Sequence, residues 1–155
     1  MRIEFQLNGE SRGAEVEPLE RLVDALRERF GAKSVKEGCG EGECGSCTVI
    51  VDGKAVASCM MLAAQVDGRE VMTAEGLGKD GELDRLQDAF LRHGAVQCGY
   101  CTPGMLMSVK ALLIANPKPN REDVVRAIEG NLCRCTGYHQ IVEAVADVAG
   151  GFDAS

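Results

Sequence analysis

The sequence contains eight cysteines, and their spacing divides them into two groups of four. The first group follows C-x4-C-x2-C with a fourth cysteine twelve positions later, and consists of Cys39, Cys44, Cys47 and Cys59. The second group pairs C-x2-C with C-x-C, and consists of Cys98, Cys101, Cys133 and Cys135. In a reducing compartment, patterned cysteines bind metal or perform redox chemistry more often than they form disulfides. We therefore expect two separate metal sites.

The first group has the spacing of a plant-type 2Fe–2S site. Four thiolates around two ferric ions and two sulfides carry a formal charge of about −2, which backbone N–H groups directed at the sulfurs must balance. A loop that wraps so closely needs residues that adopt positive φ, and glycines stand at positions 38, 40, 42 and 45. Residues 40–45 also satisfy G-x-G-x-x-G, but no convincing helix follows them and two glutamates would repel a pyrophosphate. A zinc site and plain structural or disulfide cysteines are weaker alternatives.

Each pair of the second group stands before a predicted helix, one from Pro103 and one from about Tyr138. Helix N-termini carry positive potential, which favours thiolates and offsets the charge of a cluster. Four ligands from two helix starts could cap the end of a helical bundle. From spacing alone a zinc site stays open, whereas a thioredoxin-like pair is disfavoured because the βαβ pattern is missing.

The first half of the chain reads as a small α+β domain. Apolar alternation and turn signals predict strands at residues 3–7, near Glu15–Val16, at 48–51, at 54–57 and at 69–73. Asn8-Gly9 and Asp52-Gly53 are hairpin signals, and a helix is expected between Pro18 and Gly31. The second hairpin would return Cys59 to the glycine-rich loop.

The second half reads as helical. A glycine-rich linker is expected at residues 76–81, which divides the chain into domains 1–76 and 82–150. Apolar periodicity predicts helices that end at Gly94, begin at Pro103, follow an Asn120 cap and begin near Tyr138. Four short amphipathic helices with short connections indicate a small four-helix bundle.

Charge and hydropathy limit the classes of partner that the chain is expected to bind. The net charge is −7 and no basic stripe occurs, so nucleic-acid binding has little support. No apolar run reaches the length of a membrane span, and the N-terminal residues lack the apolar stretch of a secretory signal. We therefore expect a cytoplasmic protein with no membrane insertion.

Two long motifs closely resemble the iron–sulfur module of the molybdenum hydroxylase (xanthine oxidase) family. One is the glycine-rich loop GCGEGECGSCTV at residues 38–49, and the other combines QCGYCTPGM at 97–105 with NLCRCTGY at 131–138. The resemblance covers nearly the whole chain and includes the small subunits of carbon monoxide dehydrogenases. It implies an α+β chain in which an N-terminal β-grasp, plant-type ferredoxin-like domain precedes an all-α four-helix-bundle 2Fe–2S domain.

The resemblance also implies the two ligand sets and their neighbours. Cys39, Cys44, Cys47 and Cys59 would hold a flavin-proximal 2Fe–2S cluster. Cys98, Cys101, Cys133 and Cys135 would hold a molybdenum-proximal cluster. Gln97 and Cys135 match family positions that approach the pterin cofactor.

By the same resemblance, the chain is expected to be the electron-transfer small subunit of a heteromeric oxidoreductase, of the xanthine, aldehyde, carbon monoxide or N-heterocycle dehydrogenase type. Electrons would pass from a molybdopterin centre through both clusters toward FAD, with no substrate chemistry on this chain. The expected partners are a large molybdopterin subunit and a medium FAD subunit. A zinc-stapled structural adaptor and an independent ferredoxin are the alternatives, and no residue discriminates the substrate.

Overall fold

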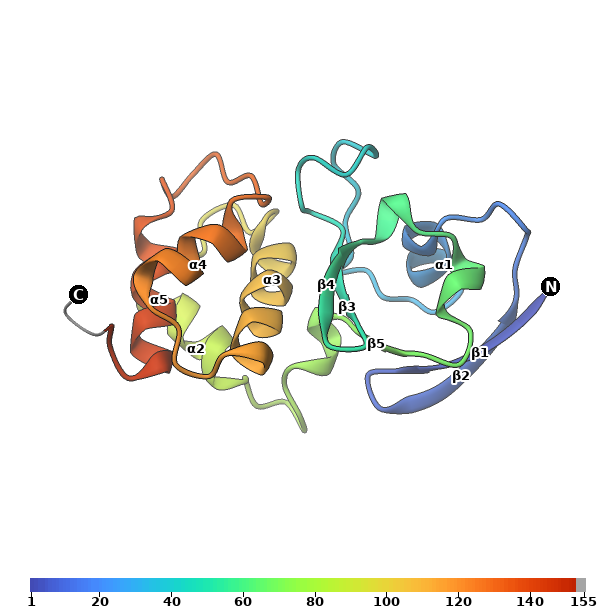
Figure 1. Cartoon of the computed structure of the whole chain (residues 1–155), viewed down its shortest axis with the longest axis horizontal. Helices are drawn as coiled ribbons and strands as arrows, with labels where there is room; N and C mark the ends of the chain where they lie inside the picture. Colours follow the sequence, from blue (N-terminus) through green and yellow to red (C-terminus); the bar gives the residue numbers. More distant parts are fainter. Residues whose placement is uncertain (153–155) are drawn as a thin grey trace.

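The computed structural model describes residues 1–152, which form a β-rich half and a helical half side by side (Figure 1). The first half contains β1 (Arg2–Leu7), β2 (Glu10–Glu15), α1 (Leu22–Glu28), β3 (Thr48–Val51), β4 (Lys54–Ala57) and β5 (Glu70–Met72). Short 3-10 helices are η1 (Ser58–Met60), η2 (Ala63–Val66) and η3 (Ala74–Gly76). The second half contains α2 (Arg85–Arg92), α3 (Thr102–Ala115), α4 (Arg121–Ile128) and α5 (His139–Ala149). The predicted α+β class is confirmed.

The five strands form one mixed sheet in the order β2-β1-β5-β3-β4. The β1–β5 pair is parallel, while the other pairs are antiparallel. The inward side chains Ile3, Phe5 and Leu7 of β1 pack with α1 in one buried cluster, as the period of two along a strand requires. A mixed sheet that packs against one helix is the expected β-grasp arrangement.

Both predicted hairpin turns are present, and the first corrects the position of the second strand. Asn8 and Gly9 both have positive φ, at 53° and 83°, which is the geometry of a tight two-residue hairpin turn. The strand therefore begins at once, at Glu10, and the prediction of a strand near Glu15–Val16 was too late. The cause is that β2 is an edge strand without buried side chains, so it lacks the apolar alternation that marks β1.

β3 lies between the two hydrophobic cores, which explains why all four of its residues are buried. Val49 and Val51 belong to the core that α1 completes, whereas Ile50 belongs to the core of the helical half. α3 packs against β3. Leu77, inside the predicted linker, is also buried in the helical core. The halves are thus joined by packing as well as by the chain, and the limits 1–76 and 82–150 stay a prediction.

The predicted Asn120 cap is present at the start of α4. Asn120 Oδ1 accepts a hydrogen bond from Asp123 N at 2.9 Å, and Asp123 Oδ2 accepts one from Asn120 N at 3.0 Å. This reciprocal pair satisfies two N–H groups that the first turn of a helix leaves free. Within residues 1–152, none of the helices combines the length and apolarity needed to cross a bilayer.

Replacing Asn120 with Ala should lower the free energy of unfolding by about 1 kcal/mol, because the Asp123 N–H loses its acceptor. Urea titration of the purified protein, followed by far-ultraviolet circular dichroism, measures the change. Lys118→Ala is the matched control, since Lys118 is exposed just outside the same helix. A loss for Asn120→Ala no larger than that of the control would mean that the cap contributes nothing.

Candidate metal centres

The glycine-rich loop and η1 bring the first cysteine group together as two contacting pairs. Cys39 N donates to Cys44 Sγ at 3.4 Å, and Cys44 N donates to Cys39 Sγ at 3.4 Å. Cys59 N donates to Cys47 Sγ at 3.5 Å, and the Cys59 thiol contacts Cys47. The hairpin of β3 and β4 thus returns Cys59 to the loop, as expected from the sequence.

Backbone N–H groups of the loop point at sulfur. Glu41 N and Glu43 N donate to Cys39 Sγ at 3.4 and 3.3 Å, in addition to the Cys44 N–H. Gly40 and Gly42 have φ of 70° and 81°, a conformation in which a side chain would be strained. These turns direct the amides inward, where they can balance the charge of a bound anionic cluster.

The thiols of the first group differ in acidity. Burial pushes the pKa of Cys44 upward, but hydrogen bonds from the N–H and hydroxyl of Ser46 and from Cys39 outweigh it and lower the pKa to about 7. Burial, and then the contact with Cys47, raise the pKa of Cys59 to about 11. A metal that binds here displaces the remaining protons.

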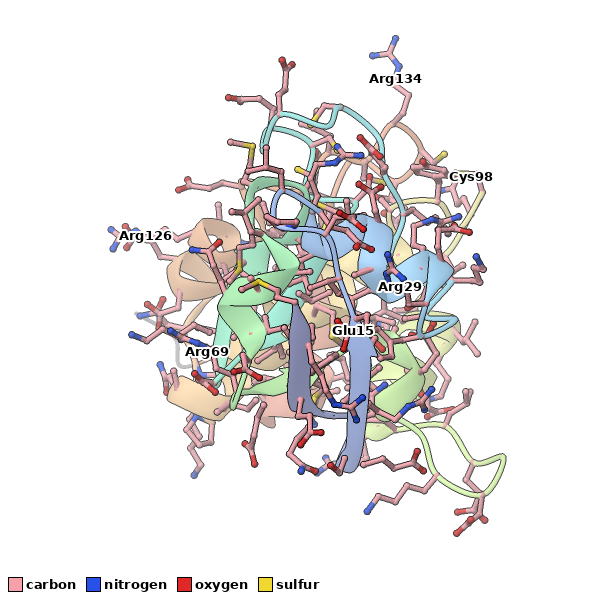
Figure 2. The ribbon with its side chains drawn as sticks, turned by 90° about the vertical axis from the view of Figure 1, so that its right-hand side faces the viewer. Glu15, Arg29, Arg69, Cys98, Arg126 and Arg134 are labelled. Carbon is pink, nitrogen blue, oxygen red and sulfur yellow. The ribbon has the colours of Figure 1, made fainter. Side chains whose placement is uncertain are left out.

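The second group also forms two contacting pairs, Cys98 with Cys135 and Cys101 with Cys133. All four cysteines line one cavity, together with Gln97. Gln97, Cys98 and Cys135 are exposed, so this cavity opens to the surface. Figure 2 shows Cys98 and Arg134 at the same end of the molecule, far from Arg69.

Both predicted helices follow their cysteine pairs, since α3 begins at Thr102 and α5 at His139. Only Cys101 lies at the helix terminus itself, as the N-cap of α3, whereas Cys133 and Cys135 lie in the loop before α5. Burial, followed by the hydrogen bond with Cys133, raises the pKa of Cys101 to about 12. Low dielectric thus outweighs the positive potential of the helix end.

Cys133, which is the partner of Cys101, and the exposed Cys98 both have lowered pKa values. For Cys133, burial is outweighed by hydrogen bonds from the hydroxyl and N–H of Thr136, and its pKa is lowered. The Cys133 sulfur lies 3.1 Å from the Thr136 hydroxyl. The pKa of Cys98 is lowered first by the Tyr100 N–H and then by its contact with Cys135.

These shifts predict selective alkylation of the metal-free chain at pH 7.5. Cys44 and Cys101 are both half-buried, but the thiolate is the reactive form. With pKa values of about 7 and about 12, Cys44 should react with iodoacetamide at least about tenfold faster than Cys101. Below pH 7 the Cys44 rate itself should fall as its thiolate is protonated, and above pH 7 its advantage over Cys101 should shrink as the pH rises. Mass spectrometry of the alkylated peptides measures both rates, and equal rates in the folded chain would contradict the acidity difference. Urea denaturation is the control and should equalise them.

A buried polar junction joins the two cysteine groups. Leu132 N donates to the carbonyl of Cys44 at 2.9 Å, and Leu132 directly precedes Cys133. Asn131, which is 4% exposed, donates to the carbonyl of Gly45 at 3.2 Å and accepts from the Ser108 hydroxyl at 2.7 Å. No sequence prediction pointed to this junction, although an asparagine two positions before Cys133 was a signal that could have indicated it.

The paired sulfurs fit a diiron cluster. Among residues 1–152, no three His, Cys, Asp or Glu side chains are grouped so as to hold a single metal ion. A 2Fe–2S cluster needs a different arrangement, with two protein ligands on each of two irons. Both cysteine groups offer two pairs of sulfurs, and the first surrounds them with inward N–H groups.

Comparisons with known proteins identify both halves. The family model described as 2Fe-2S iron-sulfur cluster binding domain matches residues 5–77, and the model described as 2Fe-2S binding domain matches residues 73–146. The nicotinate dehydrogenase small FeS subunit of Eubacterium barkeri is 57% identical over 143 residues, covering 92% of this chain and 91% of the relative. The nicotine 6-hydroxylase small subunit of Paenarthrobacter nicotinovorans is 52% identical over 150 residues, covering 97% and 90%.

Solved structures agree with the sequence comparisons. A chain of quinoline 2-oxidoreductase from Pseudomonas putida 86 superposes with a TM-score of 0.93 at 48% identity, covering 97% of this chain and 94% of that one. Aldehyde oxidoreductase from Desulfovibrio gigas also gives 0.93, at 42% identity, but only 17% of its longer chain is covered. With two 2Fe–2S-binding domains and this similarity along almost its full length, the chain belongs to the family of small iron–sulfur subunits of the molybdenum hydroxylases.

Proposed function

We propose that this chain relays electrons one at a time between two partner subunits of an oxidoreductase. Cys39, Cys44, Cys47 and Cys59 would hold one 2Fe–2S cluster, and Cys98, Cys101, Cys133 and Cys135 the other. Each bound cluster accepts and returns one electron. The observation that carries the proposal is the hydrogen bond from Leu132 N to the Cys44 carbonyl, which links the backbones of the two ligand groups directly.

The open faces of the two sites suggest the order of the relay. The cavity of the second group has Gln97 and Cys135 at its exposed rim, and we assign them the pterin-proximal positions. The large molybdopterin subunit would therefore cover this cavity. Cys39 is exposed in the other loop, so a medium subunit that carries FAD would dock there. This order sends electrons from molybdenum through the second cluster, then the first, to FAD.

The proposal also covers the domain limits of the chain and the cellular location and substrate class of the complex. We assign the domain limits to residues 1–76 and 82–150, which keep each cysteine group within one domain. We place the complex in the cytoplasm, because eight ligand thiolates must stay reduced until the clusters are assembled. Relatives that act on nicotinate, nicotine and quinoline make N-heterocycles the first substrates to test on the complex.

Two exposed apolar side chains allow the partner faces to be tested separately. Leu132, 60% exposed, lines the second cavity. Met60, 63% exposed, lies beside the first loop, where a Cβ added at Gly42 would be 3.0 Å from its Cγ. Leu132→Gln should weaken retention of the molybdopterin chain in an affinity-purified complex, and Met60→Gln that of the FAD chain. Leu91→Gln is the matched control, because Leu91 is 57% exposed on α2 and lines neither site.

Quantitative mass spectrometry of the co-purified chains gives the result. The expected complex contains one molybdopterin-binding and one FAD-binding partner, and each variant depletes its own. A fully active chain that purifies alone would instead support an independent ferredoxin. Depletion of both partners by Leu91→Gln, or of neither by the other two variants, would contradict the assignment of the faces.

A further inference from the structure

Lys36 belongs to the segment before the first cysteine group, but its ammonium group reaches the second. Nζ donates to the carbonyl of Gly99 at 3.1 Å and approaches that of Tyr100 at 3.4 Å. These are the two residues between Cys98 and Cys101. Nζ also lies 5.1 Å from the centre of the Tyr100 ring, a favourable position for a cation. One positive charge is thereby fixed inside the second ligand loop.

This charge has no carboxylate partner in the part of the chain that the structure describes. Charged side chains near it in the sequence are paired with the opposite charge: Lys33 Nζ with Glu28 at 3.2 Å, and the Glu37 carboxylate with Arg21 at 2.7 Å. Acidic residues outnumber basic ones by 24 to 17, so carboxylates are plentiful. The half-buried Lys36 side chain is held by two carbonyls and a ring, so its positive charge is not neutralised by these contacts. A cluster bound in the ligand loop that it enters would supply a neighbouring anion.

We propose that Lys36 is a positioning residue that raises the reduction potential of the cluster at Cys98, Cys101, Cys133 and Cys135. The inference rests on the proposed ligand assignment. One-electron reduction converts one ferric ion to ferrous and adds one negative charge to a site of about −2. A nearby positive charge stabilises the reduced site more than the oxidised one. In the working complex the electron comes from the molybdenum subunit, and in a titration it comes from dithionite.

The surrounding contacts hold the charge in place. Tyr100 Oη donates to the carbonyl of Glu37 at 2.7 Å. The Glu37 carboxylate in turn accepts from Arg21 at 2.7 and 2.9 Å. Residues 36–37 and 99–100 therefore donate hydrogen bonds to each other, through Lys36 Nζ in one direction and Tyr100 Oη in the other. A charge that is already ordered does not have to reorient when the electron arrives.

Reductive titration of the intact complex, followed by EPR of the two reduced clusters, tests the proposal. Lys36→Gln removes the charge but keeps an N–H donor, and Lys36→Arg keeps the charge. Lys33→Gln is the matched control, because it removes a charge from the same segment at an exposed site. The variants Cys44→Ala and Cys101→Ala, each of which should lose one signal, assign the signals to the clusters.

For Lys36→Gln, the ratio of reduced to oxidised second cluster should fall about tenfold at the wild-type midpoint, which is about 59 mV for one electron. The first cluster should change less, Lys36→Arg should stay near wild type, and Lys33→Gln should shift neither cluster. An unchanged second cluster in Lys36→Gln, or an equal shift of both clusters, overturns the proposal. Loss of about two irons in Lys36→Gln overturns it too, since the role would then be structural. Fewer than two signals in the wild-type complex would instead defeat the ligand assignment itself.

Discussion

Replacing Cys44 with Ala should abolish one of the two reduced-cluster EPR signals of the intact complex and leave the other at full intensity. Cys44 pairs with Cys39 through reciprocal N–H to sulfur hydrogen bonds, so its loss deprives one iron of a ligand. Iron should fall from about four to about two per chain. Turnover of the complex should fall by orders of magnitude, because the relay loses one of its two centres.

Cys101→Ala provides the reciprocal test. Cys101 pairs with Cys133 in the second group, so this variant should lose the signal that Cys44→Ala retains. Together the two variants assign each EPR signal to its cysteine group. Survival of both signals at full intensity in either variant would show that the altered cysteine is not a ligand.

The second large effect is expected from Gly104→Ala, at the junction of the two halves. A Cβ at Gly104 would lie 2.2 Å from the carbonyl oxygen of Gly45 and 3.3 Å from Ser46 Cα. Backbone atoms cannot rotate away as a side chain can, so α3 must separate from the first cysteine loop. We expect a loss of about 3 kcal/mol in the free energy of unfolding and a melting temperature about 10 °C lower.

Gly130→Ala is a sharp control for this effect. Gly130 belongs to the same junction, but a Cβ there meets no atom within 4 Å. Differential scanning calorimetry of both variants, with their clusters loaded, compares the melting temperatures. If Gly104→Ala melts within a degree or two of Gly130→Ala, the close packing of α3 on the loop is not what joins the halves.

Local signals in the sequence were enough to predict most elements. Asn8-Gly9 and Asp52-Gly53 turn the chain with positive φ at both positions, and Asn120 caps its helix as expected. Strand boundaries were predicted less accurately where buried side chains do not recur at a regular spacing. β2 has no buried residue, so nothing in its composition marked where it begins.

The grouping of the eight cysteines followed from spacing and from the family resemblance, but their pairing did not. Cys98 contacts Cys135 and not Cys101, which is nearer in the sequence, because the loop before α5 folds over the start of α3. The ligand assignment itself stays a prediction. The prediction that a helix N-terminus would lower the pKa of Cys101 was wrong. Burial raises that pKa, and the extent of burial depends on the folded chain.

Long-range contacts were beyond the reach of sequence patterns. Asn131 and Gly45 are 86 positions apart in the chain, and Lys36 and Gly99 are 63 apart. These contacts depend on how α3 docks against β3, which no local period encodes. Figure 1 shows the loop before β3 and the loop before α5 on the same edge, opposite the linker, where Leu132 N donates to the Cys44 carbonyl at 2.9 Å.

Analysis of iron, acid-labile sulfide and zinc in the purified complex, combined with Mössbauer spectroscopy, shows whether the eight cysteines hold two diiron clusters. We expect about four irons and about four sulfides per copy of this chain, with spectra of two diiron centres and no stoichiometric zinc. A colourless complex that contains zinc in place of iron, and still turns over, would contradict this expectation.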